Sequence, residues 1–210
     1  MYVVTLSATF GAGGGTIGPA VAERLDVPFI DRAIPVTVAN DLGVTIEDAL
    51  SRDEQVKGWL SRLLTAAAPL SSDYMIGCDP PRMALLPDTE FVNCTQAAIR
   101  KIVSAKGGVL LGRAAAIVLK DHPTALHVRL DGDPDRRIHR AMRTMHLSEA
   151  DAKDTLVRND TARANYVRHF YRADPADPGH YHVLLDSTRL SVETCAELIV
   201  AAAKASHPVG

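Results

Sequence analysis

The sequence has few of the features that mark secreted or membrane-bound proteins. Its 3 cysteines, Cys78, Cys94 and Cys195, are odd in number and lack the paired spacing of a zinc site, which argues for reduced thiols rather than disulfides. No apolar run approaches the roughly 20 residues of a membrane-spanning helix, and the first residues lack the charge and length of a signal peptide. We therefore expect a cytoplasmic protein without a membrane partner.

Neither sign of charge dominates, and aromatic residues are few. The 23 basic and 25 acidic side chains give a formal net charge of −2, so nothing in the overall charge suggests a surface for nucleic acid. Aromatic residues make up 5% of the 210 residues and hydrophobic residues 47%, which is enough for one well-buried domain. We expect a globular protein with no nucleic-acid partner.

Strand-like and helix-like segments alternate along the chain. The predicted strands are 2–6, 27–30, 108–111, 125–130 and 181–185. The predicted helices are 16–25, a helical region over 34–68, 88–105, 113–119, 134–145, 148–171 and 191–205. This alternation predicts a three-layer α/β fold, in which helices cover a doubly wound sheet of parallel strands.

A glycine-rich stretch follows the first predicted strand and precedes the first predicted helix. It reads Gly11, Ala12, Gly13, Gly14, Gly15, Thr16. Because glycine has no Cβ, such residues can adopt positive φ angles, turn their N–H groups inward and let a phosphate approach the main chain. The helix that follows adds its unpaired N–H groups and its positive dipole end. The pattern predicts a phosphate site, where the hydroxyl of Thr16 could reach a phosphate or Mg²⁺.

This loop lacks the cation that such loops usually carry. When the motif G-x-x-x-x-G-K-[ST] is aligned on residues 11–13, its lysine falls on Gly14 and its first glycine on Ala8. No Lys or Arg precedes Arg24 in the sequence. A glycine-rich turn that packs a helix onto a sheet and binds nothing is the alternative, and the loop by itself leaves both interpretations open.

Each predicted strand is followed by polar or glycine residues. In a doubly wound sheet, ligands bind outside the carboxyl ends of the strands. The residues at those ends are 7–15, Asp31 with Arg32, Gly112 with Arg113, 131–133, and 186–188. A single polar strand end is explained by its exposure to solvent. Five such strand ends, one of which is followed by a glycine-rich loop, favour a site that binds phosphoryl groups.

Arginines gather in the predicted helix 134–145 and in the helical segment after it. A planar, permanently charged guanidinium binds phosphate oxygens in two-pronged fashion and neutralises charge that develops during phosphoryl transfer. In the later segment the candidates are Arg158 and Arg163, with Asp160 placed to orient either of them. The alternative, a solvated basic surface, is the interpretation we adopt for Arg143, Arg168 and Arg172.

Six segments resemble, in their order and spacing, the cytidylate kinase-like proteins, a branch of the nucleoside monophosphate kinases. They are GAGGGT, FIDRAI, GVLLGR, ALHVRLDGDPDRRIHR, RNDTAR and LLDSTRLSVE. The resemblance is weakest at about 36–91. It implies a five-stranded parallel sheet of order 2-3-1-4-5 and a single P-loop kinase-like domain over 1–210. Within this domain it implies a helical nucleoside-monophosphate-binding insertion at about 34–90 and an arginine-rich lid at about 146–174.

The resemblance also implies a role for each candidate residue. The donor phosphates of ATP would be held by Gly11, Ala12, Gly13, Gly14, Gly15 and Thr16, with Thr16 also on Mg²⁺. The acceptor would be bound by Asp31, Arg32, Arg113 and Asp160. The catalytic residues would be Arg158 and Arg163 of the lid, together with Asp31, which could take the proton of a hydroxyl acceptor.

The chain departs from the family pattern at two places. True cytidylate kinases have a lysine at the position of Gly14, and the kinase-like branch usually has an arginine at the position of Gly15. Leu111 replaces the acidic residue that precedes the Gly-Arg pair in true cytidylate kinases, which weakens the case for ordinary Mg²⁺ handling. An arginine finger is worth about 10³ to 10⁵ in rate, so a missing loop cation threatens catalysis more than it threatens phosphate binding.

The leading hypothesis is a phosphotransferase that moves the γ-phosphate of ATP to a small acceptor, with a pyrimidine nucleoside monophosphate such as CMP as the first candidate. Two alternatives stay open. One is a nucleotide-binding or regulatory module with impaired catalysis, and the other is a kinase for a hydroxylated metabolite. The sequence also leaves open whether the protein forms a homodimer.

Overall fold

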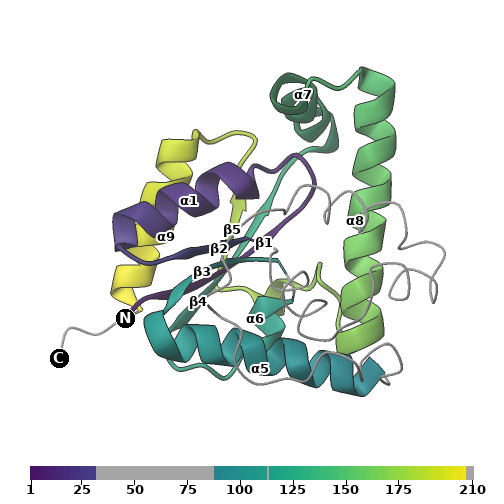
Figure 1. The fold of residues 1–210 in the computed structure, drawn as a ribbon. Coiled ribbons are helices and arrows are strands. Elements are labelled where there is room, and N and C mark those ends of the chain that lie inside the picture. Colours follow the sequence, from purple (N-terminus) through teal and green to yellow (C-terminus); the bar gives the residue numbers. More distant parts are fainter. Residues whose placement is uncertain (32–87, 113, 207–210) are drawn as a thin grey trace. The chain divides into compact units, whose positions relative to one another are not determined.

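The structure, a computed structural model, describes residues 1–31, 88–112 and 114–206 (Figure 1). The predicted helical region 34–68 lies outside the described residues, as do Arg32, Arg113 and most of the predicted insertion. The chain divides into two compact units, one of Met1–Asp31 with Ile99–Gly210 and one of Arg32–Ala98. All five strands belong to the first unit.

The first unit is built on a sheet of five parallel strands in the order β2-β3-β1-β4-β5. The strands are β1 (Val3–Ala8), β2 (Phe29–Asp31), β3 (Gly108–Leu111), β4 (Ala125–Asp131) and β5 (Val183–Asp186). Strand β1 is central, and its Leu6 pairs with Leu111 on one side and Val128 on the other. The predicted sheet and its strand order are confirmed.

Helices cover both faces of the sheet and the end at which the strands finish (Figure 1). Helices α1 (Gly14–Leu25) and α9 (Val192–Ala205) lie together on one face. On the other face lie α6 (Ala115–Val118) and the part of α5 (Asp88–Lys106) that belongs to this unit, from Ile99 onward. Helix α7 (Pro134–Met145) packs against the long helix α8 (Glu149–Tyr171), which stands beside the carboxyl ends of the strands.

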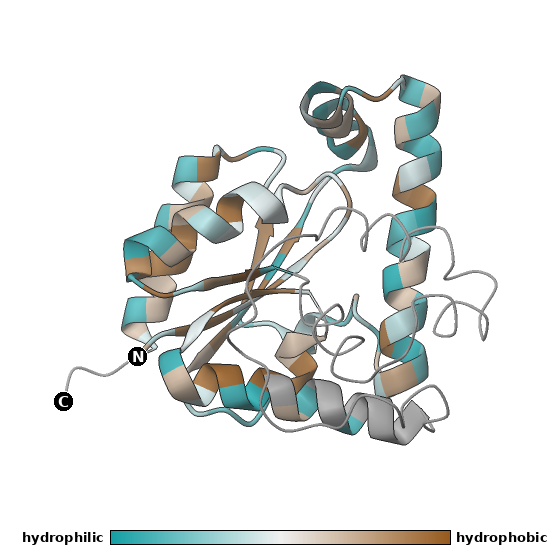
Figure 2. Cartoon of the chain, viewed as in Figure 1, coloured by the Kyte–Doolittle hydropathy of each residue, from teal (hydrophilic) through white to brown (hydrophobic). Residues whose placement is uncertain are grey.

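The core lies between β1, β4 and the helices α1 and α9. The central strands are covered on both faces and are therefore apolar along most of their length, as Figure 2 shows. Leu6 and Val128 are at most 1% exposed, and Ile17 of α1 and Ile199 of α9 pack into the same cluster without exposure. This packing fixes the end of β1 and the start of α1, which are the two ends of the glycine-rich loop.

Several element boundaries differ from the predicted ones for local reasons. Helix α1 begins at Gly14 rather than Thr16, because Gly13 already serves as its N-cap. Strand β5 begins at Val183 rather than at residue 181. A short 3-10 turn, Pro178–His180, precedes it, and the His182 side chain takes part in the pairing by accepting the N–H of His127 through Nδ1.

Candidate functional site

The loop between β1 and α1 has the conformations that its glycines predict. Gly11 has a φ of 76° and Gly13 a φ of 81°, both in the left-handed region that side chains disfavour. A Cβ at Gly11 would also collide with the carbonyl oxygen of Arg137, at the start of α7. The turn is closed by the N–H of Ala12, which donates to the carbonyl of Thr9 at 3.1 Å. Glycine at these positions lets the loop fit beneath α7.

The N-terminus of α1 faces this loop without an anionic cap. Its N-cap is Gly13, which has no side chain to accept a hydrogen bond, and the first turn holds no acidic residue. The N–H groups of Thr16 and Ile17 bond to the carbonyl of Gly13 at 3.0 and 2.9 Å. The earlier amides and the positive end of the helix dipole are the groups that bind phosphate in glycine-rich loops.

Gly14 and Gly15, the two positions at which the family carries a cation, differ in the space that they leave for a side chain. A Cβ at Gly14 would lie 2.8 Å from Ala8 Cβ and 2.9 Å from Leu111 Cδ1, inside the packed interior. A Cβ at Gly15 would meet no atom within 4 Å, and Gly15 is exposed. A lysine at 14 therefore does not fit, whereas an arginine at 15 has room. The hydroxyl-bearing Thr16 is exposed beside it.

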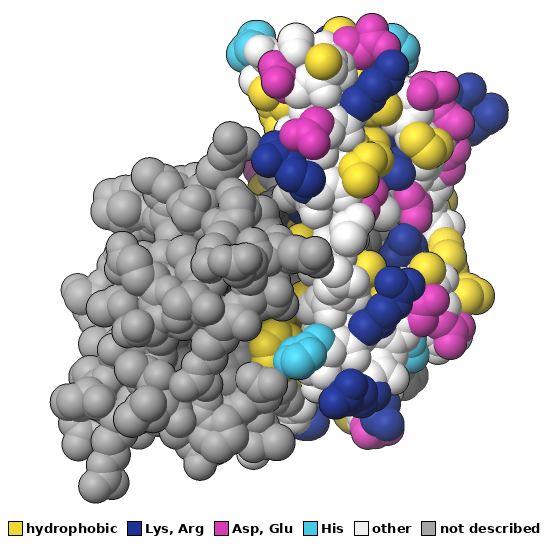
Figure 3. Space-filling view, turned by 90° about the vertical axis from the view of Figure 1, so that its right-hand side faces the viewer, with side chains coloured by type: hydrophobic (Ala, Val, Ile, Leu, Met, Phe, Trp, Pro, Cys, Tyr) yellow, Lys and Arg dark blue, Asp and Glu magenta, His cyan; other side chains and the backbone are white. Residues whose placement is uncertain are grey.

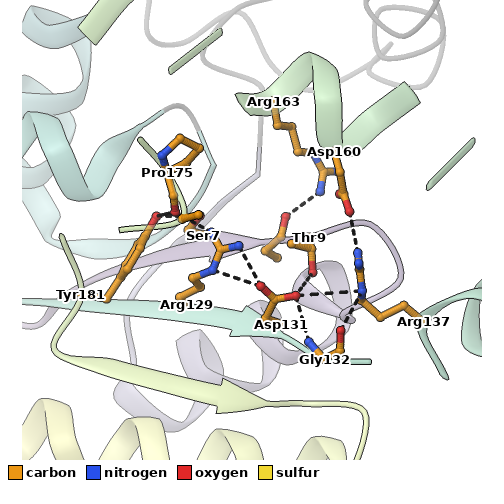
Figure 4. A network of polar contacts seen from close by, with 12 residues as sticks. Ser7, Thr9, Arg129, Asp131, Gly132, Arg137, Asp160, Arg163, Pro175 and Tyr181 are labelled. Atoms are coloured by element: carbon orange, nitrogen blue, oxygen red, sulfur yellow. Dashed lines mark hydrogen bonds and ion pairs between the residues drawn. The ribbon is translucent and has the colours of Figure 1, made fainter. Parts of the chain in front are cut away.

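Two side chains of α8 that the sequence singled out bond to the end of β1 and to the start of the loop that follows it (Figure 4). The carboxylate of Asp160 accepts the N–H of Phe10 at 2.8 Å and the Nη1 of Arg137 at 2.6 Å. Arg163 donates its Nη1 to the carbonyl of Ala8 at 2.5 Å. The predicted lid helix thus contacts the end of β1 and the residue that precedes the predicted phosphate loop.

A second carboxylate, Asp131, lies at the end of β4 and is already paired. It accepts hydrogen bonds from Thr9 Oγ1 at 2.9 Å and from Arg129 Nη2 at 2.7 Å, and Arg137 Nε lies 3.9 Å away (Figure 4). Burial opposes ionisation of this carboxyl, but the hydrogen bonds from Arg129, the N–H of Gly132 and Thr9 outweigh it and hold the pKa of Asp131 below its ordinary value. Asp131 is charged and serves to brace the loop.

The remaining predicted site residues are spread over the unit. Arg158 projects from α8 and pairs with Asp154 at 3.0 Å, where both side chains are more than half exposed. Asp31 ends β2, is exposed, and stands opposite Leu111 in the register. Arg32 and Arg113 lie outside the described residues. The structure therefore brings Asp160 and Arg163 to the loop, and its contacts leave Arg158 at the surface.

Three residues of the site were not among the predicted ones. They are Arg137, Arg140 and Ser187. The Oγ of Ser187, which is fully buried, donates to the carbonyl of Ala12 at 2.6 Å, and its own carbonyl accepts Nη2 of Arg140 at 2.5 Å. All three lie in segments that the sequence marks, the arginine cluster and the polar end of the fifth strand. The sequence pattern does not distinguish them from their exposed neighbours, because their hydrogen bonds join residues that are far apart in the sequence.

The family model for the cytidylate kinase-like family matches residues 3–189, nearly the whole chain. The chain belongs to the cytidylate kinase-like family. This match includes the glycine-rich loop, the strand ends and the arginine-bearing helices described above, and it confirms the family that the sequence motifs indicated.

Several solved structures, two of them kinases, share the fold of this cytidylate kinase-like protein. An uncharacterized protein from Eubacterium ventriosum superposes with a TM-score of 0.67 at 16% identity, over 97% of this chain and 99% of that one. Shikimate kinase from Acinetobacter baumannii, in complex with shikimate, has a TM-score of 0.51 at 16% identity, over 99% and 96%. A gluconokinase from Sinorhizobium meliloti has a TM-score of 0.51 at 15% identity, over 97% and 92%. At these identities the similarity concerns the fold alone.

One curated relative matches part of the chain. It is the uronate isomerase of Corynebacterium glutamicum, 27% identical over 103 residues, which are 49% of this chain. The chain spans only 20% of the length of that relative.

The described part of the chain contains neither a cluster of metal-ligating side chains nor a membrane-spanning helix. No group of three or more His, Cys, Asp or Glu residues there could hold a metal ion. None of the helices that the structure describes is long and apolar enough to cross a membrane.

On the face in Figure 3, basic and acidic side chains are interspersed over α7 and α8.

Proposed function

We propose that this cytidylate kinase-like protein transfers the γ-phosphate of ATP to a small acceptor, with CMP or another pyrimidine nucleoside monophosphate as the favoured one. The observation that carries the proposal is the glycine loop, which joins the central strand to an α1 N-terminus that has no anionic cap. The family and the kinase fold support phosphoryl transfer. The acceptor rests on the sequence motifs.

The groups at the loop fit the phosphates of ATP. The donor phosphates would be held by the segment of Gly11, Ala12, Gly13, Gly14, Gly15 and Thr16, because it lies at the positive end of α1. The N–H groups of Gly11, Gly13, Gly14 and Gly15 would face the phosphate oxygens, whereas those of Ala12 and Thr16 bond to the carbonyls of Thr9 and Gly13 and hold the loop in shape. For Mg²⁺ the chain offers the exposed hydroxyl of Thr16, since Asp131 is already paired with Arg129 and Leu111 occupies the position of the family's acidic residue. A bound Mg²⁺ would neutralise charge on the phosphate oxygens.

The lid residues would act on the transferring group. An acceptor oxygen bonds to the γ-phosphorus while the bond to the β–γ bridging oxygen breaks, and ADP leaves with that oxygen. Arg163, which bonds to the carbonyl of Ala8 at the end of β1, and Arg158, whose partner in the described part of the chain is the exposed Asp154, would supply guanidinium groups to the developing charge. Closure of α8 over the loop would exclude water and prevent hydrolysis of ATP.

The acceptor would lie toward β2 and β3, beyond the loop. Asp31 at the end of β2, together with Arg32, Arg113 and Asp160, would bind it. A phosphate acceptor needs no strong base, whereas for a hydroxyl acceptor Asp31 would take the proton.

A direct assay tests this proposal. The protein is mixed with Mg²⁺ and ATP and with CMP, UMP, AMP, GMP, shikimate or gluconate in turn, and ADP formation is followed by a coupled assay, with ATP binding measured in parallel. ADP formed only with a pyrimidine monophosphate supports the proposal. ADP formed with a hydroxylated metabolite reassigns the acceptor. ATP binding without ADP from any acceptor ends the catalytic claim.

A second candidate function is a nucleotide-binding or regulatory module that has lost turnover. It is favoured by the absence of a side chain at both Gly14 and Gly15, and by the contact between Asp160 and the loop amide of Phe10. Calorimetry that shows ATP affinity without product would support it. Phosphoryl transfer restored by Gly15→Arg would show that the scaffold can still accommodate catalysis.

A further inference from the structure

We propose that Arg140 of α7 contacts the donor phosphates and takes the place of the cation missing from the loop. This inference rests on the proposed binding of ATP at the loop. It names the side chain that supplies positive charge to the phosphates. In the family this charge comes from a residue of the loop, whereas here it would come from α7.

The position of Arg140 is the first observation. Its Nη1 lies 2.8 Å from the point where a Cβ of Gly13 would be, so the guanidinium is held directly against the N-cap of α1. Gly13 leaves this space open because it lacks a side chain. A cation at this point adds to the positive potential that the loop amides and the helix dipole already produce.

The unused hydrogen-bonding capacity of Arg140 is the second observation. Its Nη2 donates to the carbonyl of Ser187, but its Nη1 is shielded from solvent and has no hydrogen-bond partner in the described part of the chain. A buried N–H of a charged group without an acceptor costs free energy, since it has lost its water and gained nothing. An anionic oxygen at the loop would supply the acceptor.

The neighbouring arginine on the same helix is already committed. Arg137 donates to the carbonyls of Phe10 and Gly132 and to the carboxylate of Asp160. It braces the loop and α8, and its charge is balanced by Asp160. Arg140 has no such ion pair among the described contacts, so its positive charge remains available to a ligand.

Ser187 makes the placement rigid. It is fully buried, its Oγ donates to the carbonyl of Ala12 in the loop, and its carbonyl accepts from Arg140. One residue therefore fixes both the loop and the guanidinium. Such fixing lowers the entropic cost of ordering a long side chain when a ligand binds.

The test compares nucleotides that differ only in phosphate number. Calorimetry measures binding of adenosine, AMP, ADP and ATP, the last two with Mg²⁺, to the wild type, Arg140→Met, Arg140→Lys and the control Arg143→Met, an exposed arginine on the same helix. We expect Arg140→Met to weaken ADP and ATP binding by roughly 10- to 100-fold, as for the loss of a charge-assisted hydrogen bond, and to leave adenosine binding unchanged. Arg140→Lys should recover part of the loss, and Arg143→Met should change binding less than twofold.

The double variant Arg140→Met with Gly15→Arg separates charge from structure. Because position 15 is open, the new arginine should restore ATP affinity to within a few-fold of the wild type. Unchanged ATP affinity in Arg140→Met, or an equal loss for adenosine and ATP, overturns the inference while leaving ATP binding intact. A wild type that binds no nucleotide contradicts the proposed function itself. Thermal unfolding without ligand checks that each variant is folded.

Discussion

At the scale of single residues, Asp160 joins a charged side chain, Arg137, to a backbone amide at the start of the loop, the N–H of Phe10. Its carboxylate is about a quarter exposed, and it accepts from Arg137, whose side chain is 8% exposed. Arg137 in turn supports the carbonyl of Phe10. Removing the negative charge leaves a largely buried guanidinium with a weaker partner, which is more costly than breaking an ion pair in water.

We therefore predict that Asp160→Asn lowers the free energy of unfolding by about 1 to 3 kcal/mol, because Arg137 loses the nearer of its two ionic partners and keeps only Asp131, at 3.9 Å. The matched control is Asp154→Asn in the same helix, which breaks the exposed pair with Arg158 and should cost about 0.5 kcal/mol or less. Urea unfolding followed by circular dichroism measures both. Equal costs for the two variants would show that the Asp160 contact adds nothing to stability.

The two adjacent glycines of the loop give a second prediction. Gly14→Lys should destabilise the protein by about 1 to 3 kcal/mol, because its Cβ would overlap Ala8 and Leu111. Gly15→Arg should change stability by less than about 1 kcal/mol, since the gain in helix propensity offsets the unfavourable charge at the helix N-terminus. Denaturant midpoints and ATP affinity are measured for both variants. A stable Gly14→Lys variant would mean that the loop repacks readily.

At the scale of elements, short-range signals predicted most helices and strands close to where the structure has them. Helix α7 was predicted with the bounds that the structure gives, because Pro134 stands at its first position and Asp133 caps it by accepting the N–H of Arg136 at 3.1 Å. Strand β5 was placed too early, because the ring of His182 hydrogen-bonds the backbone of His127, and that contact crosses the fold.

The glycine loop could be predicted because its conformation depends on residues next to one another. The contacts that surround it could not. Arg163 reaches Ala8 and Ser187 reaches Ala12 across most of the chain, and no periodicity or spacing records such pairs. The family resemblance indicated Arg163 and Asp160, whereas Arg140 emerges only from its position beside Gly13.

Helix capping provides a prediction at this scale. Asp133 caps α7, and Ser191 caps α9 by accepting the N–H of Thr194 at 3.0 Å. We expect Asp133→Ala and Ser191→Ala each to cost about 1 kcal/mol of stability. Only Asp133→Ala should also weaken ATP binding, because α7 carries Arg140. Unfolding curves and calorimetry on both variants check this, and a similar loss of ATP affinity in Ser191→Ala would point to global loosening instead.

At the scale of the whole molecule, stability toward acid depends on a histidine in the core of the sheet. His127 lies in β4, is 3% exposed, bonds to Thr5 Oγ1 through Nδ1 at 2.9 Å, and stacks on His182. Burial, followed by the neighbouring charge of His182, lowers the pKa of His127 from 6.5 to about 4. The folded protein therefore holds this ring neutral under conditions where the unfolded chain binds a proton.

The sign of the pH dependence follows from this shift. Between pH 6.5 and 4 the unfolded state binds a proton on His127 that the folded state does not bind. The free energy of unfolding is therefore highest above pH 6.5 and falls by about 3 kcal/mol as the pH drops toward 4. We predict that His127→Gln, which keeps a side-chain polar group near Thr5, loses stability at pH 7 but shows a shallower decline between pH 6.5 and 4 than the wild type. The Asp131 carboxyl, whose pKa is lowered, affects stability only at more acidic pH.

Urea unfolding at half-unit pH intervals measures this decline, with His122→Gln as the control. His122 lies in the turn before β4 and is among the weaker influences on the pKa of His127, so its loss should leave the slope close to that of the wild type. A His127→Gln variant that declines as steeply as the wild type would assign the acid sensitivity to other groups. A shallower slope in that variant alone would place the proton-sensitive group in the centre of the sheet, away from the phosphate loop.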